Sequence, residues 1–305
     1  MIAPAASLKE NVRRNKMELL ARDRRIAFPR RPLIMGILNI NDDSFSGDGR
    51  INTEWALARA RELISLGADL IDVGGESART NRSAITPAEE LHRILPFLEG
   101  FPTACAAAAP RDSEQVHPPL LSINTWRPEV AGPALAAGGH LLNDMSALPD
   151  DRNARLCAET GAALLIMHSV GEPKVAHTHV GYPDILQTLR DFFREKIALA
   201  ERAGLPRAAL VLDPGIDFAK QTEDNLRIYR GLDALREFDR PILLPVSRKS
   251  VIGRVLELPD PRDRDPGTAA CIVAGHLRGA SIFRVHNVDM AWRVNRSIRQ
   301  VAAAS

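Results

Sequence analysis

Residues 33–39 read Leu-Ile-Met-Gly-Ile-Leu-Asn, a short apolar run that ends in a polar side chain. An apolar run of this length between polar residues predicts a buried β-strand. The pattern recurs along the chain, and longer amphipathic stretches typical of helices separate the runs. The runs are Leu33–Leu38, Leu70–Val73, Leu120–Ile123, Leu141–Leu142, Ala162–Met167, Ala208–Leu212, Ile242–Val246 and Ser281–Phe283. Strands and helices that alternate about eight times predict a single-domain (β/α)8 barrel, an α/β fold.

Residues able to do chemistry follow nearly every run. In barrels of this kind the functional groups lie on the loops at the carboxyl ends of the strands. The sequence therefore predicts one ring of loops as the active site. The residues in this position are Asn39, Glu76, Asn124, Asn143, Asp144, His168, Asp213, Ser247, Arg248, Lys249, Arg284 and His286.

The composition is that of a globular protein with one large core. The chain has 305 residues, of which 45% are hydrophobic and 26% charged, and its net charge is +2. This charge gives no global signal for nucleic acid or an anionic membrane, so we expect neither partner. The three cysteines follow no metal-ligand spacing and their odd number argues against a disulfide framework, which favours a reducing cytoplasm. We find no apolar run of membrane-spanning length and no signal-peptide core.

Residues 1–31 stand apart from the repeat as a basic amino-terminal extension, and residues 32–303 form the expected barrel domain. The extension has nine basic and three acidic residues. It is open to reading as an organelle-targeting segment, as an anion-binding arm or as a solvated helix that caps the amino-terminal mouth of the barrel. A second irregular segment, Pro102–Pro119, is rich in Ala and Pro and is expected to be a surface loop.

The carboxyl-terminal half carries the most specific chemistry. Asp213 ends a strand before Pro-Gly, where it either forms a turn or accepts two parallel hydrogen bonds from a guanidine-like edge such as that of a pterin. Asn143 and Lys249 are expected at the same mouth, where their amide and ammonium groups could hydrogen-bond to the remaining nitrogens and the carbonyl oxygen of such a ring. The loops after strands seven and eight are the usual phosphate corner of this barrel. Because these loops contain basic residues, we expect a phosphorylated or diphosphorylated substrate.

An ordered set of motifs resembles the dihydropteroate synthase family. The motifs are Met35-Gly36-Ile37-Leu38-Asn39, Asp43-Ser44-Phe45-Ser46, Asp72-Val73-Gly74-Gly75-Glu76-Ser77, Asn143-Asp144, Met167-His168, Leu212-Asp213-Pro214-Gly215, Ser247-Arg248-Lys249-Ser250 and Arg284-Val285-His286. They cover the chain from about residue 33 to about residue 300 in the family's order. The resemblance implies a transferase that joins 6-hydroxymethyl-7,8-dihydropterin diphosphate to 4-aminobenzoate, with release of dihydropteroate and diphosphate.

The resemblance also implies residue roles. Lys249, Arg284 and Asp213 are the expected catalytic residues, and the expected pterin site is made of Asn124, Asn143, Asp213, Lys249 and Arg284. Asn39, Ser250, Arg284 and His286 are expected to hold the diphosphate, with Asn39 as the ligand of a Mg²⁺ cofactor. Ala78, Arg79, Phe218 and Ser250 are expected to border the acceptor pocket, and the polar segments 41–50 and 76–84 to close over it. A homodimer is expected, with the helix Gly267–Gly279 as the first candidate for its interface.

Several positions depart from the family pattern. Asn124 stands where the family has Asp, Ala78 and Thr80 replace a Thr and a Pro of loop two, and Asp217 replaces a Gly. These changes leave two alternatives open: a paralogue that binds pterin diphosphate but uses another acceptor or is inactive, and a pterin-binding barrel of the methyltransferase type. The pair His177 and His179 has a spacing that could grip a metal on a strand but fits a polar loop as well.

Overall fold

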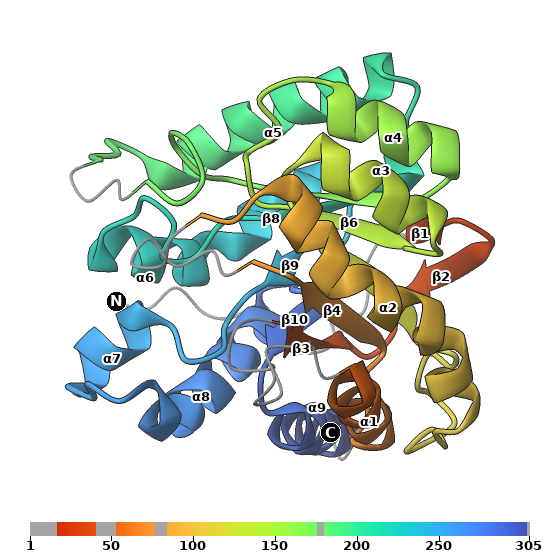
Figure 1. Cartoon of the computed structure of the whole chain (residues 1–305). Helices are drawn as coiled ribbons and strands as arrows, with labels where there is room; N and C mark the ends of the chain where they lie inside the picture. Colours follow the sequence, from red (N-terminus) through yellow and green to blue (C-terminus); the bar gives the residue numbers. More distant parts are fainter. Residues whose placement is uncertain (1–16, 41–52, 77–83, 176–179, 304–305) are drawn as a thin grey trace.

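The protein, analysed as a computed structural model, is an eight-stranded parallel barrel surrounded by helices. The structure describes residues 17–40, 53–76, 84–175 and 180–303. Its strands are β3 (Leu33–Asn39), β4 (Leu70–Gly74), β5 (Leu120–Asn124), β6 (Leu141–Asp144), β7 (Ala163–Met167), β8 (Leu210–Asp213), β9 (Leu243–Leu244) and β10 (Ile282–Val285). The barrel closes where β8 meets the start of β9, through a parallel bridge between Leu212 and Ile242. The expected (β/α)8 fold is confirmed (Figure 1).

Nine α-helices connect and cover the strands in the part of the chain that the structure describes. They are α1 (Thr53–Ser65), α2 (Pro87–Ala106), α3 (Pro128–Ala136), α4 (Arg152–Thr160), α5 (Ile185–Arg202), α6 (Thr222–Gly231), α7 (Ser250–Leu256), α8 (Asp265–Leu277) and α9 (Val288–Ala303). Short 3-10 segments occupy Arg207–Ala209, Leu232–Phe238 and Pro261–Arg264. Among these described helices none is long and apolar enough to cross a bilayer.

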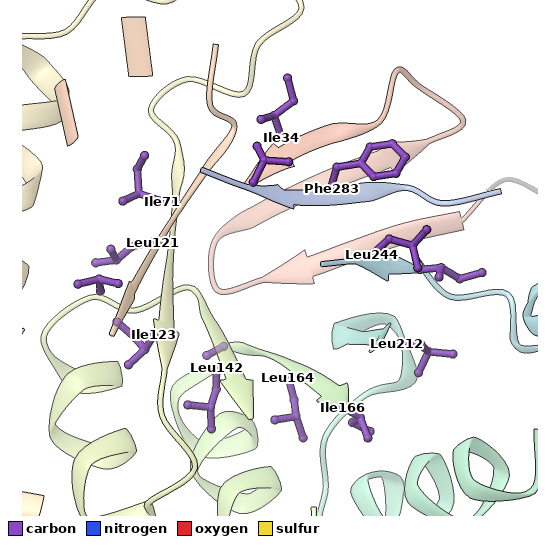
Figure 2. Packing of buried hydrophobic residues seen from close by; sticks show 14 of the residues in the cluster. Ile34, Ile71, Leu121, Ile123, Leu142, Leu164, Ile166, Leu212, Leu244 and Phe283 are labelled. Atoms are coloured by element: carbon purple, nitrogen blue, oxygen red, sulfur yellow. The ribbon is translucent and has the colours of Figure 1, made fainter. Parts of the chain in front are cut away.

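Alternate residues of each strand belong to two separate cores. Ile71 in β4, Leu164 in β7 and Phe283 in β10 pack in an outer layer that includes helix residues (Figure 2). Their neighbours Leu70, Leu165 and Ile282 fill the inside of the barrel. Because side chains of a strand alternate between its faces, this division also decides which polar residues point inward.

A hairpin closes the amino-terminal end of the barrel. Strands β1 (Met17–Ala21) and β2 (Arg24–Phe28) pair antiparallel, and Leu19 and Phe28 are buried with Leu33 and Leu120 at the starts of barrel strands. The expectation of a solvated helix is wrong for residues 17–28, because their alternate apolar side chains pack into the open end of the barrel. Residues 1–16 lie outside the described residues.

The expected loop Pro102–Pro119 is wrong in its first part, since α2 continues to Ala106. Phe97, Phe101 and Cys105 are buried at helical spacing. Their packing against the barrel outweighs the hydrogen bond that Pro102 cannot donate. Strand β9 is shorter than its apolar run because Pro245, just after it, has no N–H for the ladder.

Candidate active site

Inward-facing polar residues line the carboxyl-terminal mouth of the barrel. In β4, Leu70 points into the barrel core, so Asp72, two residues on, points inward as well. The same register applies to Asn124 after Leu120 in β5, to Asn143 after Leu141 in β6 and to Arg284 after Ile282 in β10. The strands therefore bring together residues that lie up to 212 positions apart in the sequence.

Asp72 is the centre of this cluster. Its carboxylate is fully buried and accepts hydrogen bonds from Ser122 Oγ at 2.6 Å, Asn124 Nδ2 at 3.2 Å, Asn143 Nδ2 at 3.1 Å and Arg284 Nε at 2.7 Å. A buried carboxylate is stable only when it is paired and hydrogen-bonded in this way. The sequence motif contained Asp72, but we assigned it no role. The sequence does contain a signal for it, because a strand residue that lies between two outward-facing residues must point into the barrel.

Asn124 keeps one acceptor free for a ligand. Its Nδ2 donates to Asp72, whereas its Oδ1 is buried without a hydrogen-bond partner among the described residues. An unpaired buried carbonyl is costly, so a ring N–H that reaches it would be stabilised. The amide also suits this position physically, because an Asp here would place a second carboxylate against Asp72.

Asp213 ends β8 at the same mouth and is 3% exposed. Its Oδ1 accepts the N–H of Gly215 at 2.7 Å, so the turn-forming role is confirmed. Burial raises its pKa to about 6, although Lys249, Lys220 and Arg284 oppose the rise. Gly215 has φ +70°, and a Cβ there would lie 1.9 Å from the carbonyl oxygen of His168. Only glycine lets the turn approach this closely.

Lys249 and Phe218 lie together beside Asp213. The ammonium of Lys249 donates to Ile216 O at 3.0 Å and lies 4.8 Å from the centre of the Phe218 ring. Burial lowers the pKa of Lys249, against the attraction of Asp217 and Asp213. These contacts place an expected pterin residue and an expected acceptor residue side by side.

Asp217, which replaces the family's usual glycine, joins the β8 loop to α7. It has φ 67°, and its carboxylate accepts the N–H groups of Ser250 and Val251. Its own N–H donates to Asn225 Oδ1 at 2.8 Å, which helps to hold a conformation that is uncommon outside glycine. The Ser250 N–H is therefore already bonded, and the Ser250 side chain is exposed beside it.

Lys220 is a second functional candidate that the sequence did not reveal. Its ammonium is buried and donates to His168 Nδ1 at 2.8 Å, Phe218 O at 3.0 Å and His168 O at 3.3 Å. Burial lowers the pKa of Lys220 to about 7, and burial with the nearby Lys220 charge lowers the pKa of His168 to about 3. The pair ties the β8 loop to the end of β7, far away in the sequence.

Three of the four expected diphosphate residues, Asn39, Arg284 and His286, lie at the ends of two neighbouring strands, whereas Ser250 begins α7. Strand β10 pairs with β3 so that Val285 stands beside Gly36, which places His286 next to the strand that ends at Asn39. Burial, followed by the charges of Arg284 and Arg248, lowers the pKa of His286 to about 4. Arg248 forms a two-bond ion pair with Asp265 at 2.8 and 3.1 Å.

Both ends of loop two are held by buried charges. Arg127, in the loop after β5, pairs with Glu76 and Glu90, and it donates to Ile85 O at 3.1 Å. Lys174 adds a 2.6 Å bond to Glu76. Ala78 and Arg79, the rest of loop two over 77–83, loop one over 41–50 and the pair His177 and His179 all lie outside the described residues.

The donor set at Asn39 fits a magnesium ion only as one ligand among several. In the described ranges no group of three His, Cys, Asp or Glu could hold a metal ion. Mg²⁺ usually keeps several waters and reaches the protein through one or two ligands together with substrate phosphates. Asn39, an exposed residue at the end of β3, agrees with this arrangement.

The comparisons with known proteins point to one family. A model described as pterin binding enzyme matches residues 35–286. Dihydropteroate synthase of Escherichia coli strain K12 is 34% identical over 274 residues, which are 90% of this chain and 93% of that protein. The chain belongs to the dihydropteroate synthase family. Membership makes it a transferase of folate synthesis.

Solved dihydropteroate synthase structures share the barrel. The Xanthomonas albilineans enzyme with 4-aminobenzoic acid superposes with a TM-score of 0.83 at 33% identity, over 95% of this chain and 99% of that chain. The same enzyme in complex with 7,8-dihydropteroate gives a TM-score of 0.78 at 32% identity, over 91% and 96% of the two chains. The recognition of a dihydropteroate synthase from its ordered motifs is confirmed.

Proposed function

We propose that this member of the family joins 6-hydroxymethyl-7,8-dihydropterin diphosphate to 4-aminobenzoate through the residues of the barrel mouth. The supporting observation is the pair of buried carboxylates, Asp72 and Asp213, with amides and cations between them. In this proposal Asp213 accepts two hydrogen bonds from the amino-pyrimidinone edge of the pterin, while Asn143, Asn124 and Lys249 serve its other polar atoms.

In this proposal Arg284 contacts Asp72 on one side and the substrate on the other. Its Nε is held by Asp72, which leaves the planar guanidinium to stack on the pterin and to reach a phosphate oxygen. His286 and the Ser250 hydroxyl supply further donors to the diphosphate. Because Asp72 fixes the guanidinium before the substrate arrives, little reorganisation is needed when negative charge develops on the leaving group.

The reaction breaks the bond between the pterin methylene carbon and the diphosphate oxygen. The bonding electrons leave with diphosphate, and the lone pair of the arylamine nitrogen forms the new carbon–nitrogen bond. The nitrogen then loses one proton to the diphosphate or to water. Asn39 would hold Mg²⁺, which when bound supplies positive charge to the diphosphate oxygens. Phe218, with Ala78 and Arg79, borders the acceptor in this proposal.

We also propose a cytoplasmic homodimer. Three free cysteines, two of them buried, suit a reducing compartment. Val273 on α8 is 38% exposed, and Val255 and Leu256 on the adjacent α7 are 52% and 46% exposed, which gives an apolar surface for a second copy. Light scattering measures the molar mass of the purified protein in solution. A wild-type protein with the mass of a monomer, and the same mass in V273E, would contradict the dimer.

The activity test uses purified protein with pterin diphosphate and Mg²⁺, with and without 4-aminobenzoate. Diphosphate release that requires 4-aminobenzoate and gives dihydropteroate by mass supports the proposal. Tight binding of pterin diphosphate without this product would favour a paralogue with another acceptor, for which Asn124 and the altered loop two are the specific reasons. D213A serves as the inactive control and R155A, at an exposed ion pair, as the active one.

A further inference from the structure

Ser247 contacts His286 at two points. Ser247 follows the short strand β9, is 8% exposed, and places its Oγ 2.9 Å from His286 Nδ1. The backbone N–H of His286 also donates to this Oγ, at 3.1 Å. The two residues are 39 positions apart, so only the closed barrel brings them into contact.

These two contacts determine the position of the imidazole proton. A serine hydroxyl has one proton to donate and two lone pairs to accept with. One lone pair takes the His286 N–H, and the structure describes no acceptor for the hydroxyl proton other than His286 Nδ1. If Nδ1 carried the proton instead, the buried hydroxyl would be left without an acceptor, which is costly. The geometry therefore favours Nδ1 as the acceptor.

We propose that Ser247 is a positioning residue that keeps the His286 proton on Nε2 and thereby makes the imidazole a neutral hydrogen-bond donor to the diphosphate. This inference rests on the proposed function and deepens it. With the opposite tautomer, the Nε2 lone pair would face the phosphate oxygens and repel them. The hydroxyl thus selects the ring state that an anionic leaving group needs.

The surroundings of His286 favour a neutral ring. Burial lowers the pKa of His286 to about 4, and the cations of Arg284, Arg248 and Lys249 act in the same direction while Asp265 opposes them. A neutral ring has one donor and one acceptor nitrogen, so the choice of tautomer decides what the ligand meets. Arg284, on the strand that ends just before His286, supplies the positive charge, and His286 supplies a directed hydrogen bond.

The first test is the ¹⁵N spectrum of the full protein labelled at histidine, with His286 assigned from the H286Q variant. We expect Nδ1 of His286 to have the shift of an unprotonated nitrogen and Nε2 that of a protonated one at pH 7. In S247A we expect a mixture of tautomers, and in S247T, which keeps the hydroxyl, the wild-type signal. A proton on Nδ1 in the wild type would overturn the proposal without any variant.

The second test measures binding of inorganic diphosphate by calorimetry without added metal. S247A should bind about fivefold more weakly, the equivalent of one ordinary hydrogen bond. S247T should restore binding. In the H286Q background S247A should have no further effect, because the serine acts through the histidine. The matched control is S281A, which removes another buried serine hydroxyl, bonded to Gly279 O at the opposite end of β10.

Besides a proton on Nδ1, two binding results would contradict the role of Ser247: full diphosphate affinity in a folded S247A, or an equal loss in S247A and S281A. Failure of the proposed reaction is separable from both. The tautomer and its loss in S247A are read without turnover, so a protein that shows them but makes no dihydropteroate supports the serine and counts against the reaction.

Discussion

Arg284 Nε donates to Asp72 Oδ2 at 2.7 Å, joining β10 to β4, the two strands on either side of β3. The Asp72 side chain is fully buried and the Arg284 side chain is 20% exposed, so one partner is fixed in the core and the other reaches the mouth. In the proposed reaction this ion pair would hold the guanidinium in place for stacking on the pterin. It also makes Asp72 the residue whose loss should be felt most widely.

Replacing Asp72 with Asn should impair both activity and stability. The isosteric amide keeps the volume but cannot accept from all four donors, and it leaves Arg284 without its counter-charge. We expect kcat/KM for pterin diphosphate to fall by about tenfold to a hundredfold, the range for a hydrogen bond to a charged group. Steady-state kinetics measures this. E114Q, at an exposed ion pair with Arg299, is the matched control, and an equal loss there would contradict the central role of Asp72.

Pterin binding should depend on the ionisation of Asp213, whose pKa burial raises to about 6. Only the ionised carboxylate accepts two hydrogen bonds, so affinity for 6-hydroxymethylpterin, which carries no diphosphate, should fall about tenfold per unit below about pH 6. The same raised pKa means that the folded state binds more protons than the unfolded one. This group therefore lowers stability as the pH rises from about 4 to about 6. Fluorescence titration measures the affinity. If D213N loses affinity below about pH 6 in the same way as the wild type, the pH dependence belongs to another group.

Restoring the family's aspartate with N124D should make stability depend on pH. The new carboxylate would lie where an amide now stands 3.2 Å from Asp72 Oδ2, and the two negative charges would raise the pKa of the pair. A raised pKa in the folded state means that stability falls as the pH increases above about 4. Thermal melts from pH 4 to 8 test this. A difference in melting temperature between N124D and the wild type that stays the same at every pH would count against it.

Arg127 should be important for stability because it neutralises two buried carboxylates. The side chains of Glu76 and Glu90 are 2% and 0% exposed. In R127A, Lys174 still pairs with Glu76, but Glu90 loses its counter-charge in the core, which should cost about 3 kcal/mol of the free energy of unfolding. Urea denaturation measures this cost. R155A breaks an exposed pair and should leave the midpoint unchanged, so similar shifts in both variants would refute the explanation.

The hairpin should stabilise the barrel through its apolar plug. Leu19 is fully buried among residues that start the barrel strands. L19A should cost about 2–5 kcal/mol of stability, the range for truncating a buried leucine. Because the hairpin lies at the end of the barrel opposite the site, KM for pterin diphosphate should stay at its wild-type value at 25 °C. V301A, at a residue 66% exposed on α9, is the control for both measurements.

The sequence by itself determined the barrel and the face on which the chemistry lies. Apolar runs that end in polar residues carry this information locally, because strands alternate their side chains and parallel strands end at one edge. This reasoning placed Asp213, Asn143, Lys249 and Arg284 at the carboxyl-terminal mouth. The ordered motifs then identified the family without any contact being known.

Only the tertiary structure decided how those residues are held. Asp72 takes its donors from three other strands, Lys220 meets His168 across 52 positions, and Ser247 meets His286 across 39. No local pattern contains such pairs, because they arise when distant segments close into one ring. The hairpin was missed for the same reason: its alternating residues are stable as strands only because the barrel offers an open apolar end for them to fill.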